Sequence, residues 1–428
     1  MKNRSVGQVF AIFCLVVLLA AIAAGCAAPA TTAPTSAPAA TSAPAATSAP
    51  AAAAPAAIEI GASVPLTGKY AAGGEQIKNG YELAVDDLNK DGGPMVKAFG
   101  KKIPFKLTLL DDASDPNTTV QQLETLYNDN KVVAYLGPYA SDLNAAGAAI
   151  AEKNKTPYLG VAFALYSIHQ QGYKYLFSPF PKSPSIATDL FKMFDTLKPE
   201  PTKYAIFAEK TDWGAELDAL WQKEIKTRNF QLVADEQYAP GSKDYTPMIT
   251  KARDGGAEVV LALPNPPDGI AIIKQMKELK FNPKITFMVR AADGLSWGTS
   301  LGKDGDYVIL APGWHPAVKY PGAQQMDQEH QQKYGKAAEA TTGPAYALVQ
   351  ILADALGRAP TYSRDALRDA IAATNMNTVI GPVKFNPDGT GQVVTIFDQW
   401  QNGKQELIWP LDQQTKPIAY PAVSFDQR

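Results

Sequence analysis

The sequence predicts an α/β protein with two doubly wound parallel-sheet lobes and a ligand cleft between them. Apolar strands alternate with amphipathic helices along the chain, and this alternation restarts near residue 204. About 370 residues follow the N-terminal region, which is more than one compact domain commonly contains. These observations together favour two similar units in tandem.

The first unit begins at residue 58. Its predicted strands cover residues 58–64, 105–110, 132–136 and 157–161, and its predicted helices cover residues 76–89, 116–128 and 141–153. The second of these helices has Asp115 as its N-cap and Pro116 as its first residue, both of which are preferred there. Strands joined by helices in this way form parallel sheets with helices on both faces.

The second unit repeats the alternation. Its predicted strands cover residues 204–208, 231–236, 259–263 and 285–289, and its predicted helices cover residues 214–228, 245–254 and 269–279. In doubly wound sheets, ligands bind outside the carboxyl ends of the strands. Two units that face each other would therefore place their strand-end loops around one cleft.

The N-terminus has the pattern of a secretory signal. Lys2 and Arg4 precede an apolar run over residues 9–24, which is too short for a confident membrane span. The ending Ala23-Ala24-Gly25-Cys26 resembles the lipobox of bacterial lipoproteins, and this resemblance implies a diacylglyceryl group on Cys26. The alternative is an ordinary signal peptide with a chance cysteine. We therefore expect residues 1–26 to be a lipoprotein signal peptide.

Residues 27–57 contain only Ala, Pro, Thr and Ser. Such a segment has nothing large to bury, so it predicts a disordered linker that tethers the folded part. The chain's only cysteines are Cys14 and Cys26, and Cys14 lies in the segment that is removed. A disulfide within the mature chain and a thiolate zinc site are therefore excluded.

Composition argues against several function classes. The formal net charge is −2 without a basic stripe, so no nucleic-acid partner is expected. His169, His315 and His330 are scattered, and the sequence has no nucleophile elbow, phosphate loop or metal motif. We therefore expect neither an enzyme nor a bound cofactor or metal.

Short motifs follow the predicted strands in a characteristic order. They are Pro65-Leu66-Thr67-Gly68, Gly74, Asn79-Gly80, Asp111-Asp112 with Asp115-Pro116, Gly137-Pro138-Tyr139-Ala140-Ser141, Asp212-Trp213-Gly214 and Gly381-Pro382-Val383-Lys384-Phe385-Asn386. This arrangement, over residues 58–409, resembles the Leu/Ile/Val-binding protein family of ABC transporter substrate-binding lipoproteins, which have the type I periplasmic binding fold. The resemblance implies a first lobe over 58–179 completed by about 314–381. It implies a second lobe over 180–313 completed by about 382–428.

Ser141 is a candidate contact for a ligand carboxylate. It begins a helix directly after a strand, and a helix start presents unpaired N–H groups and a positive dipole end. The alternative is a plain N-cap serine. The family resemblance favours the ligand contact, because a serine at the matching position binds the ligand carboxylate.

The loop after the fourth strand contains three further candidates, Ala162, Phe163 and Ala164. The resemblance implies backbone contacts to the ligand here, together with a hydroxyl that this chain lacks because Ala164 stands at that position. Phe163 is either a pocket wall or a core aromatic. Trp213 and Tyr70 match aromatic positions that cover the ligand, with packing inside a lobe as the alternative.

The partner of a ligand ammonium is expected in the loop after residue 289. One alignment with the family places Ala291 at the acidic position, and a shift of two residues places Asp293 there, which we favour. Arg290 could instead pair a second ligand carboxylate, or lie exposed. Asn265 matches a ligand-facing position, and it could equally form a turn.

The sequence therefore predicts an extracytoplasmic, membrane-anchored and monomeric solute-binding component of an ABC importer, whose partners are permease subunits. The expected ligand is an amino acid, of the branched-chain type by family, or a related small polar metabolite. A ligand-sensing receptor module and a binder of amides or carboxylic acids without an amine remain alternatives. A secreted hydrolase is a further class, but it would need a nucleophile–base pair that the sequence does not show.

Overall fold

Residues 53–428 are described by the computed structural model, and Ala54–Arg428 form one unit. The predictions for residues 1–26, including lipidation of Cys26, and for the linker as far as residue 52 lie outside the described residues. Within the described range, no helix is long and apolar enough to cross a membrane.

The first sheet has five parallel strands in the order β4-β1-β5-β6-β7. They are β1 (Ile58–Val64), β4 (Phe105–Asp111), β5 (Ala134–Leu136), β6 (Tyr158–Leu159) and β7 (Leu176–Phe177). Alternate β1 side chains, Ile58, Ile60, Ala62 and Val64, share one core cluster with the helices α1 (Ala71–Lys90) and α10 (Thr342–Arg358). The opposite face is covered by α2 (Pro116–Asn128) and α3 (Ser141–Lys153).

The second sheet has seven strands in the order β16-β15-β12-β11-β10-β8-β9, of which only β15 and β16 are antiparallel to their neighbours. They are β8 (Lys203–Glu209), β9 (Gln231–Tyr238), β10 (Val259–Ala262), β11 (Ile285–Met288), β12 (Val308–Leu310), β15 (Phe397–Gln401) and β16 (Lys404–Trp409). The helices α4 (Ser183–Phe194) and α5 (Asp212–Thr227) cover one face. The other face carries α6 (Thr246–Asp254), α7 (Pro266–Glu278) and α8 (Ser296–Leu301).

The remaining elements are short or peripheral. They are β2 (Met95–Val96), β3 (Lys101–Lys102), β13 (Asn375–Thr378), β14 (Gly381–Lys384), α9 (Ala323–Tyr334), α11 (Arg364–Ala372) and the 3-10 turns Lys97–Phe99, Tyr166–Gln171, Gly302–Gly305 and Phe425–Gln427. The predicted fold class, with two doubly wound and mainly parallel sheets, is confirmed.

Three helices begin earlier than predicted. Capping side chains and close packing set where these helices begin, and the apolar periodicity of the sequence does not show them. The helix predicted from 76 begins at Ala71, and it includes Gly74, where a Cβ would lie 1.8 Å from the Pro65 carbonyl oxygen. The helices predicted from 214 and 269 begin at Asp212 and Pro266, because Thr211 and Asn265 cap them. The predicted cap Asp115 is confirmed, since its carboxylate accepts a hydrogen bond from Thr118 N at 2.8 Å.

The chain crosses between the two sheets after β7, after β12 and after β14 within the described residues. The first and third crossovers lie side by side, because Ser178 N donates to Gly389 O and Gly391 N donates to Ser178 O, each at 2.9 Å. We propose lobe 1 as 58–179 with 314–381 and lobe 2 as 180–313 with 382–428. The membership of β7 in the first sheet and of β8 and β15 in the second supports this division.

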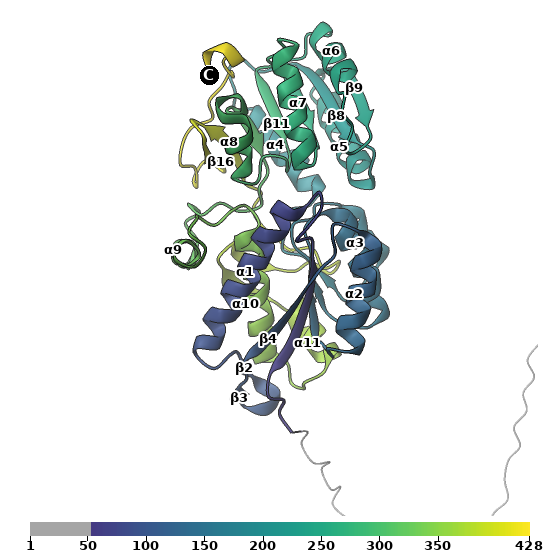
Figure 1. Cartoon of the computed structure of the whole chain (residues 1–428), viewed down its shortest axis with the longest axis vertical. Coiled ribbons are helices and arrows are strands. Elements are labelled where there is room, and N and C mark those ends of the chain that lie inside the picture. The colour runs from purple at the N-terminus through teal and green to yellow at the C-terminus, as the bar shows by residue number, and fades with distance from the viewer. Residues whose placement is uncertain (1–52) are drawn as a thin grey trace, which may run out of the picture. The chain divides into compact units, whose positions relative to one another are not determined.

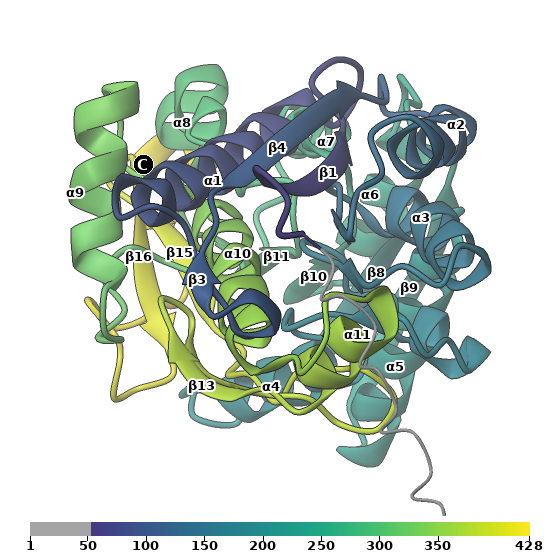
Figure 2. The same ribbon diagram turned by 90° about the horizontal axis from the view of Figure 1, so that it is seen from below.

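Lobe 1 depends on close contact between α1 and α10, which lie side by side in both views (Figures 1 and 2). Gly80 stands at this contact. A Cβ there would lie 2.4 Å from the Thr342 carbonyl oxygen and 2.8 Å from the Ala345 Cβ. The two helices can therefore approach this closely only where α1 lacks a side chain.

Replacing Gly80 with Ala should lower the free energy of unfolding by about 1–3 kcal/mol, because the new methyl group forces the two helices apart. The matched control is Gly357→Ala in α10, where the nearest atom to a new Cβ is Met95 O at 3.6 Å. That variant should be as stable as the wild type, or up to about 1 kcal/mol more stable, because Ala favours a helix. Urea unfolding measures both. Equal stability of the two variants would contradict the assignment of Gly80 to a close contact between α1 and α10.

Candidate ligand-binding site

A small cavity lies between the two sheets, and its walls come from both lobes. Most lining residues follow the carboxyl end of a strand, where doubly wound sheets place their ligand sites. The lining residues are Tyr139, Ala162, Ala164, Phe180, Ile186, Trp213, Val289, Arg290, Asp293, Ala311 and Thr341. The walls are thus mainly aliphatic and aromatic, with two charged groups on the loop after β11.

Asp293 joins the lobes at this cavity. The Tyr139 hydroxyl of lobe 1 donates a hydrogen bond to Asp293 Oδ2 at 3.0 Å. Asp293 Oδ1 is buried and has no hydrogen-bond partner among residues 53–428. Burial raises the pKa of this carboxyl well above its usual range, although Tyr139 and Arg290 oppose the shift. The site therefore holds a carboxylate oxygen that lacks a donor.

Arg290 forms a buried ion pair with Glu209, with Nη2 2.7 Å from Glu209 Oε2. Glu209 Oε1 accepts a second hydrogen bond from Asn265 N at 2.7 Å. Burial alone would lower the pKa of Arg290, but Glu209 and the nearby tyrosines raise it, so the guanidinium stays protonated. Its central carbon lies 4.9 Å from the ring centroid of Trp213 and 5.4 Å from that of Tyr70.

Trp213 is held by hydrogen bonds that reach the loop after β6. Its indole N–H donates to Ser183 Oγ at 3.0 Å, and Ser183 Oγ donates to Ala164 O at 2.9 Å. The aromatic wall is therefore fixed against lobe 1, which limits the shape of the cavity on that side.

Comparison with known proteins assigns the family. The family model described as periplasmic binding protein matches residues 57–404. The chain belongs to the periplasmic binding protein family. One relative, Leu/Ile/Val-binding protein homolog 8 of Brucella abortus (strain 2308), is 24% identical over 375 residues, covering 82% of this chain and 90% of the relative.

Solved structures share the fold of this periplasmic binding protein. The branched-chain amino acid transporter substrate-binding protein of Streptococcus pneumoniae in complex with isoleucine has a TM-score of 0.74 at 20% identity, covering 83% of this chain and all (100%) of that one. A solute-binding protein of an ABC transporter from R. palustris in complex with benzoate has a TM-score of 0.73 at 17% identity, covering 86% and 98%.

The structure places four of the sequence-predicted site residues in the cavity wall, namely Ala162, Ala164, Trp213 and Asp293. Tyr70 lies directly behind this wall, with its ring 5.9 Å from that of Tyr139. Ala291, the alternative acidic position, is buried in the core of lobe 2 rather than in the cavity wall. The roles of these residues toward a ligand stay predictions.

Ser141, Phe163 and Asn265 are outside the lining of the cavity. Ser141 is the first residue of α3 rather than its cap, because Ala140 occupies the cap position with φ of 81°, so the interpretation as a plain N-cap is wrong. The Phe163 ring stacks on His169 at 5.6 Å and faces Lys182 Nζ at 3.4 Å, on the core side. Asn265 caps α7 by accepting from Asp268 N at 3.0 Å.

Sequence reasoning also misjudged or missed several residues of the site. Arg290 is buried and paired, so the alternative that it lies exposed is wrong. Glu209 was missed, although its position at the end of β8 is a usable signal. Phe180, Ile186 and Thr341 gave no local signal, because they come from separate segments that meet only in the folded protein. Tyr139 stands in the motif over residues 137–141, but it was not assigned a role in the site.

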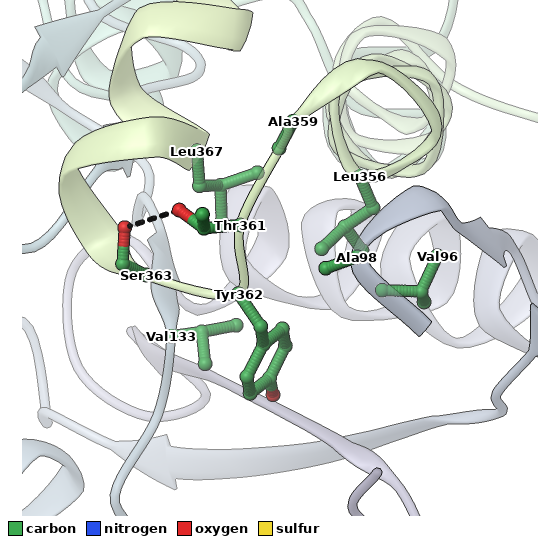
Figure 3. Close-up of a pocket in the computed structure, with 9 residues that line it drawn as sticks. All are labelled: Val96, Ala98, Val133, Leu356, Ala359, Thr361, Tyr362, Ser363 and Leu367. Carbon is green, nitrogen blue, oxygen red and sulfur yellow. Dashed lines mark hydrogen bonds between the residues drawn. The ribbon is translucent and has the colours of Figure 1, made fainter. Parts of the chain in front are cut away.

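A second cavity of about 260 Å³ lies at the other edge of lobe 1 (Figure 3). Its walls come from the β2 region, the end of α10 and the start of α11, and they are mainly aliphatic. Figure 3 shows the Thr361 and Ser363 hydroxyls next to each other, 3.2 Å apart between their oxygens, with the Tyr362 hydroxyl away from them. This cavity is near the amino ends of the strands and carries no charged group, so it is a weaker candidate site.

Replacing Asp293 with Asn should stabilise the ligand-free protein increasingly as pH rises from 5 to 8. The folded pKa of Asp293 is raised above the unfolded value of about 3.9, so the wild type loses stability as pH rises toward the folded pKa, by up to about 1.4 kcal/mol per pH unit. The Asn variant does not titrate there, and other groups cancel in the comparison. Urea unfolding at each pH measures the difference.

The matched control is Asp254→Asn, at an exposed aspartate of α6. Its stability should stay within about 0.5 kcal/mol of the wild type at each pH. A difference between Asp293→Asn and the wild type that shrinks with rising pH would contradict the assignment of Asp293 as a buried carboxyl with a raised pKa.

Proposed function

We propose that this chain is the solute-binding component of an ABC importer and that it binds a small amino acid between its two lobes. The buried Asp293 oxygen without a donor carries this proposal, because a ligand ammonium is a strong donor to a desolvated carboxylate. The isoleucine complex of the Streptococcus pneumoniae substrate-binding protein supports it. Membership in the family supports binding and release without chemical change, rather than catalysis.

The rest of the cavity suits an apolar side chain. Phe180, Ile186, Val289 and Ala311 present aliphatic or aromatic surface, and Trp213 offers a rigid aromatic face. A branched-chain amino acid would place its ammonium at Asp293 and its side chain among these residues.

A carboxylic acid without an amine is the second candidate ligand. Arg290 in the cavity wall favours it, because a guanidinium binds carboxylates well. The R. palustris relative, whose structure contains benzoate, supports the same alternative. In that case Asp293 would remain protonated and hydrogen-bonded to Tyr139, as its raised pKa allows.

Ligand binding would favour the closed arrangement of the lobes. Further hydrogen bonds besides Tyr139–Asp293 join lobe 1 and lobe 2, among them the bond from Ser183 to Ala164 O. Glu216 of α5 accepts from Tyr166 N at 2.8 Å and from Ser167 N at 2.9 Å, and Leu295 N donates to Glu339 Oε1 at 2.9 Å. A ligand that contacts both walls adds binding energy only when the lobes are closed, so it shifts the population toward that state.

Placement outside the cytoplasm completes the proposal. The basic and apolar N-terminus, the lipobox ending at Cys26 and the linker over 27–57 support secretion, lipid anchoring and tethering to the membrane. A single acyl chain binds membranes only weakly, so the two chains of a diacylglyceryl group on Cys26 would make the anchoring firm. We propose a monomer that delivers its ligand to permease subunits. A sensing role would use the same cleft with a different partner.

Thermal unfolding against a panel of ligands tests this function. The protein is unfolded and refolded to remove bound ligand, and it is then mixed with leucine, isoleucine, valine, phenylalanine, their amides, benzoate and 4-methylpentanoate. A ligand at a hundred times its Kd should add about 2.7 kcal/mol of stability. We expect the apolar amino acids to raise the midpoint, and Asp293→Ala to abolish that rise, because the ammonium loses its partner.

The control Asp254→Asn should respond to the panel as the wild type does. If only benzoate and 4-methylpentanoate raise the midpoint, the second candidate replaces the first. A flat response to the whole panel would contradict both candidate ligand classes.

A further inference from the structure

Two charged side chains of opposite sign stand on one loop at the cavity. Arg290 and Asp293 both follow β11, three residues apart, and both line the cavity wall. An amino acid carries one positive and one negative group next to each other. We propose that Arg290, rather than Ser141, binds the ligand carboxylate, so that lobe 2 recognises both charges of the amino acid. This inference rests on the proposed function.

Arg290 retains donors for a ligand. A guanidinium has five N–H groups in a fixed planar fork. Among the described residues, Nη2 donates to Glu209 at 2.7 Å and Nε donates to Pro264 O at 3.4 Å. These contacts engage two of its three nitrogens. They hold the guanidinium in one orientation. The remaining donors are available to a ligand in the cavity that Arg290 lines.

The aromatic neighbours of Arg290 strengthen this orientation. Trp213 and Tyr70 lie near the guanidinium carbon, at 4.9 Å and 5.4 Å from ring centroid to carbon. Trp213 belongs to lobe 2 and Tyr70 to lobe 1, so Arg290 is contacted from both sides of the cleft. A cation fixed in this way is preorganised for a carboxylate, which reduces the entropy lost on binding.

Lobe 1 offers weaker carboxylate chemistry at the same cavity. Ser141 is not in the wall, and its Oγ accepts a long hydrogen bond of 3.4 Å from Leu165 N. Ala164 lines the cavity without a hydroxyl. The two lobe 1 hydroxyls in the wall already donate elsewhere, from Tyr139 to Asp293 at 3.0 Å and from Thr341 to Gln76 at 2.9 Å. None of the lobe 1 side chains in the wall is positively charged.

The test compares an amino acid with its own amide, which keeps the ammonium and side chain but loses the carboxylate charge. The probes are the panel amino acid with the largest thermal shift, leucine in the first instance, and the matching amide. The variants are Ser141→Ala and the double variant Arg290→Gln/Glu209→Gln, which removes both buried charges together and so avoids leaving one unpaired. Isothermal titration calorimetry gives each Kd, and circular dichroism checks the fold.

We expect the wild type to bind the amino acid about 10- to 100-fold more tightly than the amide, the usual range for a hydrogen bond to a charged group. The Arg290→Gln/Glu209→Gln variant should lose this preference, so that its Kd values for the amino acid and for the amide become similar. Ser141→Ala should keep the preference. Arg290→Lys, which keeps the charge but not the fork, should show an intermediate preference and serves if the double variant does not fold.

The opposite pattern overturns the inference: Ser141→Ala loses the preference for the amino acid, and both Arg290 variants keep it. The proposed function would survive that result, because the wild type would still bind an amino acid. A wild type that binds neither probe would instead refute the proposed function itself, and the inference with it.

Discussion

The buried ion pair between Arg290 and Glu209 is the constraint on which the cleft depends. A charge removed from water is costly unless a partner and further hydrogen bonds compensate it. Glu209 ends β8, Arg290 follows β11, and Asn265 N, after β10, donates to the same carboxylate at 2.7 Å. One ion pair thus ties together three strand ends of the second sheet, and the lining of the cavity is built upon them.

The cleft also contains a polar group that the fold alone does not satisfy. Asp293 Oδ1 is buried and has no hydrogen-bond partner among residues 53–428. Burial also disfavours the charged form of this carboxyl. An unsatisfied buried group costs stability, so its position in a cavity wall is easier to understand as preparation for a ligand than as packing. The Tyr139 hydroxyl compensates part of this cost from the other lobe.

The two lobes meet through paired backbone, through single side chains and through a shared apolar cluster. The paired backbone of the first and third crossovers gives a fixed axis at Ser178 and Thr390. Away from it, single side chains such as Glu216 and Glu339 bridge the lobes, and one apolar cluster contains residues of both lobes. Separating the apolar surfaces of this shared cluster costs free energy, so the cluster favours the closed arrangement in addition to any bound ligand.

The sequence by itself determined the two alternating units, the Asp115 cap and the position of Trp213 and Asp293 after strand ends, because local periodicity and capping chemistry are encoded over a few residues. The tertiary structure alone decided that Asp293 meets Tyr139, 154 residues away, and that Phe163 faces the core. It also decided that Arg290 is buried against Glu209. These outcomes depend on which distant segments pack together, and no local pattern carries that information.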